Sequence, residues 1–232
     1  MNGYEDIRKV FNLLNASGAD YLVLRNYEML LSPELFVGDH ADIDLLCEDS
    51  QKIVQVLDAR STKNAGHSPY GDGIHYYLNI SGRNVSFDLR HIGDGYYCEQ
   101  WQRDLLNRKK YIHCFYVMND EDYFYTLVYH AILQKRKLSI EYKNRLSAMA
   151  AEQGISIEMH NERGFIRLLE KYMKKNGYRF VYSHDYMVPN RFRLVDSEMI
   201  EKDYYLRFRH LLFETKVKLI EFLVKIKHWA KL

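Results

Sequence analysis

Two aspartates stand two residues apart at the start of an apolar run, in the sequence VGDHADIDLLCED (residues 37–49). Side chains i and i+2 of a β-strand point to the same face, so Asp42 and Asp44 would share one face while Ile43 points into a core. Two neighbouring carboxylates repel each other, and a divalent cation bound between them removes that repulsion. Oxygen ligands of this kind suit Mg²⁺ or Mn²⁺. The pair therefore predicts a metal site.

A third aspartate could complete this site. The sequence NVSFDLRHI (84–92) alternates apolar and polar residues, as a half-buried strand does, and Asp88 lies on its polar side. On a neighbouring strand, Asp88 would help to hold two metal ions about 4 Å apart, the arrangement used for in-line displacement at phosphorus. It would also accept the proton of the attacking hydroxyl, which makes it the candidate general base. An Asp-x-Asp pair alone is more often a surface feature, and it is the third aspartate that favours a metal site.

The rest of the sequence predicts how these residues are positioned. The expected strands are 21–27, 41–48, 73–81, 84–92 and 111–118, with 73–81 and 84–92 forming a hairpin across Gly82 and Arg83. The expected helices are 3–17, 49–60, 99–110, 119–136 with Asn119 as its N-cap, 140–153, 161–176 and 200–230. Residues 178–198 read as an irregular section. The prediction is an α+β protein with an α/β domain over residues 1–118 and a mostly helical C-terminal domain over residues 119–232.

Composition limits the class of protein. The chain has 232 residues, 47% of them hydrophobic and 28% charged, which is ordinary for a globular protein. Its formal net charge is only +2, yet residues 162–232 carry 16 Lys and Arg against 9 Asp and Glu, leaving the first 161 residues acidic. Three widely spaced cysteines favour neither a disulfide framework nor a zinc cluster. No signal peptide or spanning helix is evident, so we expect a cytoplasmic setting.

The order of these elements resembles that of the nucleotidyltransferase superfamily, which has the polymerase-beta-like fold. Residues 5–118 repeat its helix, strand, loop, strand with Asp42 and Asp44, and later strand with Asp88. HADIDLL is similar to the H-x-D-I-D form of antibiotic and other small-molecule nucleotidyltransferases. More loosely, YLVLRNYE, FDLRHIGDGYY and LVYHAILQK resemble nucleotidyltransferase-like proteins of bacterial surface-polysaccharide gene clusters. The resemblance implies a mixed sheet with flanking helices, a nucleotide donor and Mg²⁺ or Mn²⁺.

The sequence departs from the superfamily just after the first strand. The superfamily usually has Gly-Ser or Gly-Gly there, where backbone amides approach the phosphates of a nucleotide. This chain has Arg25 and Asn26 instead. A guanidinium and an amide can contact a phosphate through their side chains, or the site binds something other than a standard nucleoside triphosphate.

Three further residues are candidates for substrate binding, each with a plainer alternative. Arg90, on the same side of its strand as Asp88, would neutralise donor phosphates or form a salt bridge with Asp88 or Asp42. His40 would touch the donor or have no role in its loop. Lys135 would reach a phosphate if its helix closes over the cleft, or would be solvated.

The end of the chain, LLFETKVKLIEFLVKIKHWAKL, combines apolar residues at helical spacing with interspersed lysines. We expect this helix to pack on the core or on a second subunit, as in a homodimer. The alternative is an interfacial helix on an anionic membrane, which would place the protein peripherally at the inner membrane face. That position would suit an enzyme that acts on a lipid-linked glycan.

The leading functional hypothesis is a metal-dependent transferase that moves a nucleotidyl or related phosphoryl-type group onto a hydroxyl of a small molecule or glycan precursor. Surface-polysaccharide synthesis is the context that the looser resemblance implies. One alternative is a non-catalytic or antitoxin-like homologue that acts through a protein partner. Another is an RNA-modifying nucleotidyltransferase, although an acidic front half and the lack of a recognised RNA-binding module argue against nucleic acid.

Overall fold

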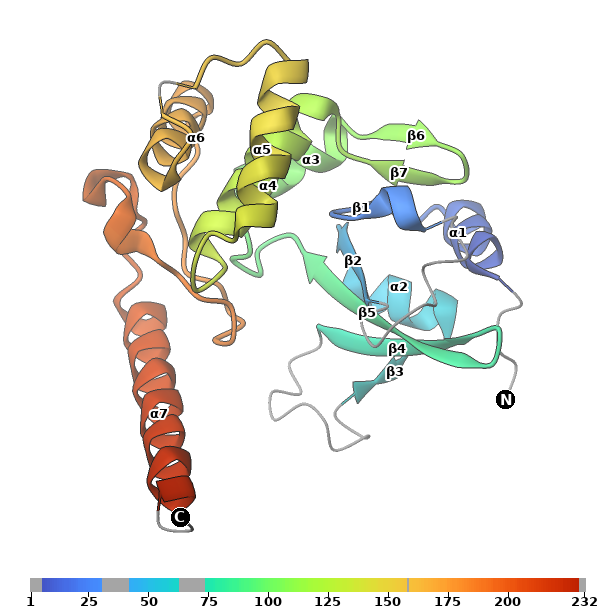
Figure 1. The fold of residues 1–232 in the computed structure, drawn as a ribbon. Helices are drawn as coiled ribbons and strands as arrows, with labels where there is room; N and C mark the ends of the chain where they lie inside the picture. Colours follow the sequence, from blue (N-terminus) through green and yellow to red (C-terminus); the bar gives the residue numbers. More distant parts are fainter. Residues whose placement is uncertain (1–5, 31–41, 63–73, 158, 230–232) are drawn as a thin grey trace.

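The computed structural model describes residues 6–30, 42–62, 74–157 and 159–229. It is an α+β structure in which the described strands form one mixed sheet in the order β3-β4-β5-β2-β1-β7-β6 (Figure 1). The strands are β1 Tyr21–Val23, β2 Asp42–Cys47, β3 Arg60–Ser61, β4 His75–Ile80, β5 Arg83–His91, β6 Lys110–Ile112 and β7 Phe115–Val117. The helices are α1 Ile7–Ala16, α2 Ser50–Leu57, α3 Glu99–Asn107, α4 Asp120–Leu133, α5 Ile140–Glu152, α6 Glu162–Asn176 and α7 Tyr204–Trp229.

Most predicted elements are confirmed, with ends that differ by a few residues. The predicted N-cap of α4 is also confirmed, because the Asn119 side chain accepts a hydrogen bond from the Asp122 amide at 2.9 Å. The single strand predicted over 111–118 is wrong, since this stretch is a hairpin of β6 and β7. His113, at the turn, has a φ of 51°. Nothing in the sequence marks that turn with glycine, asparagine or proline, the usual turn residues.

The two faces of the sheet are covered by different parts of the chain. In β2, Ile43 and Leu45 join α1 and α2 in one buried cluster. On the opposite face, Leu46 packs in a second cluster with the helices that follow the sheet in sequence, including α3, α4 and α6. This second cluster spans the predicted domain boundary at residue 118, and the division into two domains stays a prediction.

The section between α6 and α7, residues 178–198, is irregular as predicted and is called the linker segment below. It contains a short 3₁₀ turn, Phe192–Leu194, and a second 3₁₀ turn, Ser197–Met199, lies at its end. It returns toward the sheet, where the His184 amide donates to the Asp94 carbonyl at 2.9 Å. It thereby contacts the turn that follows β5.

The turn after β5 contains two glycines that serve as matched probes of this contact. Both have left-handed backbones, with φ of 86° at Gly93 and 71° at Gly95. A Cβ at Gly95 would lie 2.4 Å from the Tyr182 carbonyl oxygen, whereas one at Gly93 meets nothing within 4 Å. We expect Gly95→Ala to lower the free energy of unfolding by about 2–4 kcal/mol, through backbone strain plus overpacking. Gly93→Ala should cost only about 1 kcal/mol. Equal losses in urea titrations would contradict this close approach.

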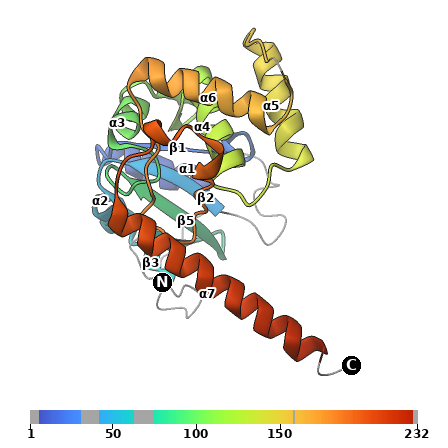
Figure 2. The same cartoon turned by 90° about the vertical axis from the view of Figure 1, so that its left-hand side faces the viewer.

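The last helix differs from the others in its surroundings. From the body of the protein α7 extends outward, and its C-terminal half stands clear of the sheet and of the other helices in both views (Figures 1 and 2). None of the helices in the described ranges has an apolar stretch long enough to cross a membrane.

Candidate functional site

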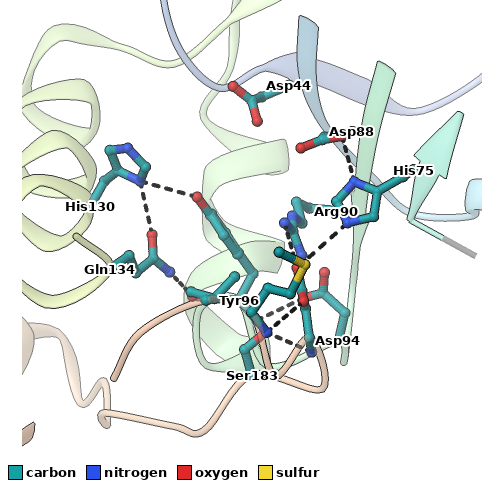
Figure 3. A network of polar contacts seen from close by, with 12 residues as sticks. Asp44, His75, Asp88, Arg90, Asp94, Tyr96, His130, Gln134 and Ser183 are labelled. Carbon is teal, nitrogen blue, oxygen red and sulfur yellow. Dashed lines mark hydrogen bonds and ion pairs between the residues drawn. The ribbon is translucent and has the colours of Figure 1, made fainter. Parts of the chain in front are cut away.

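The pairing of the central strands places the acidic residues on one face of the sheet. β2 and β5 are parallel neighbours, with Asp44 directly opposite Asp88 and Asp42 opposite Ser86. β4 runs antiparallel to β5 and places His75 opposite Asp88. Because side chains at paired positions point to the same face, Asp42, Asp44, Asp88 and His75 gather where β2 begins. Their arrangement is visible in Figure 3 for Asp44, Asp88 and His75.

Basic partners hold two of these three carboxylates. Arg25 Nη2 lies 2.5 Å from Asp44 Oδ1, and the two side chains are 12% and 7% exposed. His75 Nδ1 lies 2.7 Å from Asp88 Oδ1. Asp42 is exposed at the start of its strand. Among the described residues, no three His, Cys, Asp or Glu side chains are grouped closely enough to hold a metal ion. The register thus brings the aspartates together, while their role as metal ligands stays a prediction.

The charges of this cluster shift its acidities in opposite directions. Partial desolvation raises the pKa of Asp42, and the negative charges of Asp44 and Asp88 raise it further. Burial also opposes ionisation of Asp88, but the hydrogen bond and positive field of His75, with smaller contributions from Arg90 and Arg25, lower its pKa below the ordinary value. The negative charges of Asp44 and Asp88 thus act on Asp42, and a bound cation would relieve the repulsion there.

Arg25 is fixed by a second set of contacts on its far side. Its Nη1 donates to the Tyr96 hydroxyl at 2.5 Å and lies 3.2 Å from Nδ1 of His130. Burial lowers the pKa of His130 well below its usual range, and the charge of Arg25 lowers it further. The ring is therefore neutral at pH 7, and its Nδ1 can accept from the guanidinium. Gln134 donates to the Tyr96 carbonyl at 3.0 Å and steadies this group (Figure 3).

Arg90 lies beneath the aspartates and is almost fully buried. It pairs with neither Asp88 nor Asp42, so that predicted salt bridge is wrong. Its Nη2 donates instead to Asp185 of the linker segment at 3.0 Å, and its guanidinium stacks 4.5 Å from the centre of the Tyr96 ring. Its Nε and Nη1 are buried without a hydrogen-bond partner in the described part of the chain. Two strong donors thus lack an acceptor among the described residues, and both are shielded from solvent.

The remaining predicted residues lie elsewhere. Asn26 is exposed and accepts a hydrogen bond from Arg145 at 3.1 Å. Its φ of 54° is a left-handed conformation that favours glycine, at the place where the superfamily usually has Gly-Ser. Lys135 is exposed just beyond the end of α4. Burial and the charge of Arg25 lower the pKa of His130 most, and the charge of Lys135 makes a smaller contribution in the same direction. His40 lies outside the described residues.

Sequence reasoning missed several residues that build this site. His75 could have been found, because the alternation of its strand places it on the polar face. Tyr96 lies in a stretch that reads only as a turn, and it proves to be the ring between Arg25 and Arg90. Asp185 is 2% exposed in a section without periodicity, where no sequence signal indicates burial. These three residues connect the sheet, the turn after β5 and the linker segment.

Comparisons with known proteins give little beyond this geometry. Neither a protein-family model nor a curated protein matches the sequence. A solved structure that matches is the solution structure of the antibiotic-resistance factor ANT(2'')-Ia, at 12% sequence identity and a TM-score of 0.38. The match covers 74% of this chain and 91% of that chain. A similarity this distant assigns no family to the chain.

Proposed function

We propose that this protein is a metal-dependent transferase of the nucleotidyltransferase type. It would move a nucleotidyl or related phosphoryl-type group from a nucleotide donor to a hydroxyl of a small molecule or glycan precursor. The observation that supports this most is the register of β2 and β5, which sets Asp44 beside Asp88 with Asp42 on the same face. Carboxylates on adjacent strands are an arrangement that can hold divalent cations for phosphoryl-type transfer.

The donor set fits the proposed cation in chemistry but not yet in geometry, because no three acidic, His or Cys side chains of the described residues are grouped closely enough to hold a metal ion. Asp42, Asp44 and Asp88 offer only oxygen ligands, which suit Mg²⁺ or Mn²⁺. The Arg25 guanidinium now satisfies Asp44, so Arg25 would have to leave that carboxylate for Asp44 to become a ligand. When bound, the cation would offset the negative charge of the transferred group. We propose that Arg25, once released, contacts a donor phosphate.

Asp88 and Arg90 have the clearest proposed roles besides metal binding. His75 fixes the orientation of Asp88, which accepts the proton of the acceptor hydroxyl in this proposal. The two unpartnered N–H groups of Arg90 would bind an anionic oxygen of the donor. Asn26, His40 and Lys135 stay predicted donor contacts without structural support. The acceptor and a role in surface-polysaccharide synthesis rest on the sequence resemblance alone.

Calorimetric titration tests the proposal. Wild-type protein should bind Mg²⁺ or Mn²⁺. When a panel of nucleotides is then titrated in the presence of the metal, at least one nucleotide should also bind. Asp42→Asn should weaken metal binding by roughly tenfold or more, because a charged oxygen ligand is lost at an exposed position where folding is little affected. Asp58→Asn is the matched control, since Asp58 is the left-handed C-cap of α2 and asparagine tolerates that conformation. Equal metal binding by wild type and Asp42→Asn would refute the ligand assignment.

One observation favours a second candidate function. The Arg25–Asp44 ion pair fills the place of a cation, which would suit a non-catalytic or antitoxin-like homologue that acts through a protein partner. Such a protein would bind neither metal nor nucleotide and would purify with a stoichiometric partner. In the described part of the chain, no feature favours the RNA-modifying alternative. The predicted homodimer and the predicted membrane contact would both be made by α7. The residues on the exposed face of this helix help to decide between them.

A further inference from the structure

The last helix presents a long apolar surface to solvent. Each of its exposed large apolar side chains is 49–73% accessible, which is unusual for residues of this size. They are Tyr204, Tyr205, Phe208, Leu211, Leu212, Leu219, Ile220, Phe222, Leu223, Val224 and Ile226. A contiguous patch of this kind marks an interaction surface. Figures 1 and 2 show that the C-terminal half of the helix projects beyond the body.

The first turns of α7 are nevertheless anchored to the protein. His210 is 4% exposed, and its Nε2 donates to the Ser183 carbonyl of the linker segment at 2.7 Å. Phe213 and Val217 line a cavity of about 400 Å³ against the same segment. One side of the helix therefore already has a partner within the chain. Most of the exposed apolar residues lie on the other side and remain accessible while the helix stays docked, whereas Ile220 and Val224 share the side of Val217 farther along the helix.

The charged residues of α7 are arranged around this patch in a regular way. Each residue turns an α-helix by about 100°, so side chains spaced three, four or seven apart share a face. The residues at the centre of the apolar face are Phe208, Leu212, Leu219, Phe222 and Ile226. The same geometry puts Arg207 and Lys218 along one edge and Arg209 and Lys216 along the other, although Arg209 also lies 5.0 Å from the centre of the Tyr186 ring and Lys218 also lines the cavity. Glu214 lies farther round the helix, away from the apolar centre.

The positive edges decide between a second copy of the chain and a lipid surface. In a coiled coil the edge positions hold complementary acidic and basic residues, and the described edges of α7 offer only basic ones. Leu211 and Leu223 also make the apolar face wider than the narrow seam of a two-stranded coil. An anionic lipid surface complements both features, because headgroups meet the edge cations while acyl chains cover the apolar centre.

We propose that α7 is an interfacial helix that docks the protein on a membrane rich in anionic lipids. The centre of the face, from Phe208 to Ile226, enters the boundary between headgroups and acyl chains. The flanking Arg and Lys side chains bind lipid phosphates. This inference is independent of the proposed transferase chemistry, because none of these residues belongs to the carboxylate site.

Vesicle co-sedimentation of the full chain tests the inference. The probes are vesicles of phosphatidylcholine alone and vesicles that also contain phosphatidylglycerol. The apolar variant is Leu219→Ser with Phe222→Ser, the charge variant is Lys216→Gln with Lys218→Gln, and Glu214→Gln away from the face is the control. All five positions are exposed, so each variant should retain the circular dichroism of wild type. Light scattering without vesicles measures the oligomeric state.

Wild type and Glu214→Gln should sediment with anionic vesicles and only weakly with neutral ones, and added salt should reduce the binding. The affinity of the apolar variant for anionic vesicles should fall by at least about tenfold, because two apolar side chains that would be buried are lost. The charge variant should bind roughly thirtyfold less tightly, since it lacks two cations that each contribute about 1 kcal/mol near the surface. The proposal is overturned if wild type ignores anionic vesicles. It is also overturned if wild type is a dimer that the apolar variant dissociates, because a second copy would then cover the face.

Discussion

Replacing Asp88 with asparagine should lower the rate of group transfer by roughly 10²–10⁴-fold, the contribution of a positioned general base. Asparagine has the size of aspartate and can still hydrogen-bond to His75, so the fold and the strand register should persist. It cannot accept the proton of the acceptor hydroxyl. The measurement is steady-state turnover of a nucleotide that the wild-type titration has shown to bind.

The control for this variant is chosen to share its chemistry. Asp58→Asn makes the same change at the exposed end of α2 and should leave turnover within a few-fold of wild type. A full rate for Asp88→Asn would show that Asp88 is a structural partner of His75 and not a base. A loss caused by unfolding would be recognised by a lowered unfolding midpoint.

Removing Arg25 should have the largest effect on stability. Asp44 is buried and the Arg25 side chain is only 12% exposed, so Arg25→Gln leaves an unpaired carboxylate in the interior and should cost about 3–5 kcal/mol of unfolding free energy. Because the proposed cation takes the place of the guanidinium at Asp44, Mg²⁺ should restore part of this loss. The stabilisation by Mg²⁺ should therefore be larger in the variant than in wild type. Chemical denaturation with and without Mg²⁺ measures both quantities.

Arg145→Gln is the matched control for the stability experiment. Arg145 also pairs with a carboxylate, that of Glu28 at 3.3 Å, but this pair is on the surface. Arg145 also donates to the Tyr123 hydroxyl and to Asn26, so its loss should cost about 1–2 kcal/mol, less than that of Arg25, and should not respond to Mg²⁺. If Mg²⁺ fails to stabilise Arg25→Gln, Asp44 is not a ligand, and the non-catalytic interpretation of the Arg25–Asp44 pair gains support.

The sequence predicted those parts of the site that depend on local periodicity. The alternation in 84–92 is enough to place Asp88 on the polar face of its strand, and the spacing of Asp42 and Asp44 is enough to put them on one face. The sequence also predicted that Asp88 lies on a strand next to that of Asp42 and Asp44, and the register confirms it; that the two strands run parallel was not predicted. These features follow from side-chain period, which short stretches of sequence determine.

The contacts that modify the site could not be predicted, because each joins distant segments through loops. Arg25, which lies two residues after the end of β1, forms an ion pair with Asp44. The sequence predicted that its guanidinium would contact a phosphate. Asp185 reaches Arg90 from the linker segment, 95 residues farther along the chain. Such pairings depend on how the chain returns over the sheet, and no periodicity encodes them. The hairpin of β6 and β7 was missed for a similar reason, since its turn lacks the usual turn residues.

Crystals grown with Mn²⁺ and the bound nucleotide, measured at a wavelength where manganese scatters anomalously, would test the central claim most directly. We expect anomalous density between the carboxylates of Asp42, Asp44 and Asp88, with the Arg25 guanidinium withdrawn from Asp44 toward the nucleotide phosphates. Anomalous density elsewhere, or an Arg25–Asp44 ion pair that persists with the nucleotide bound, would contradict the account.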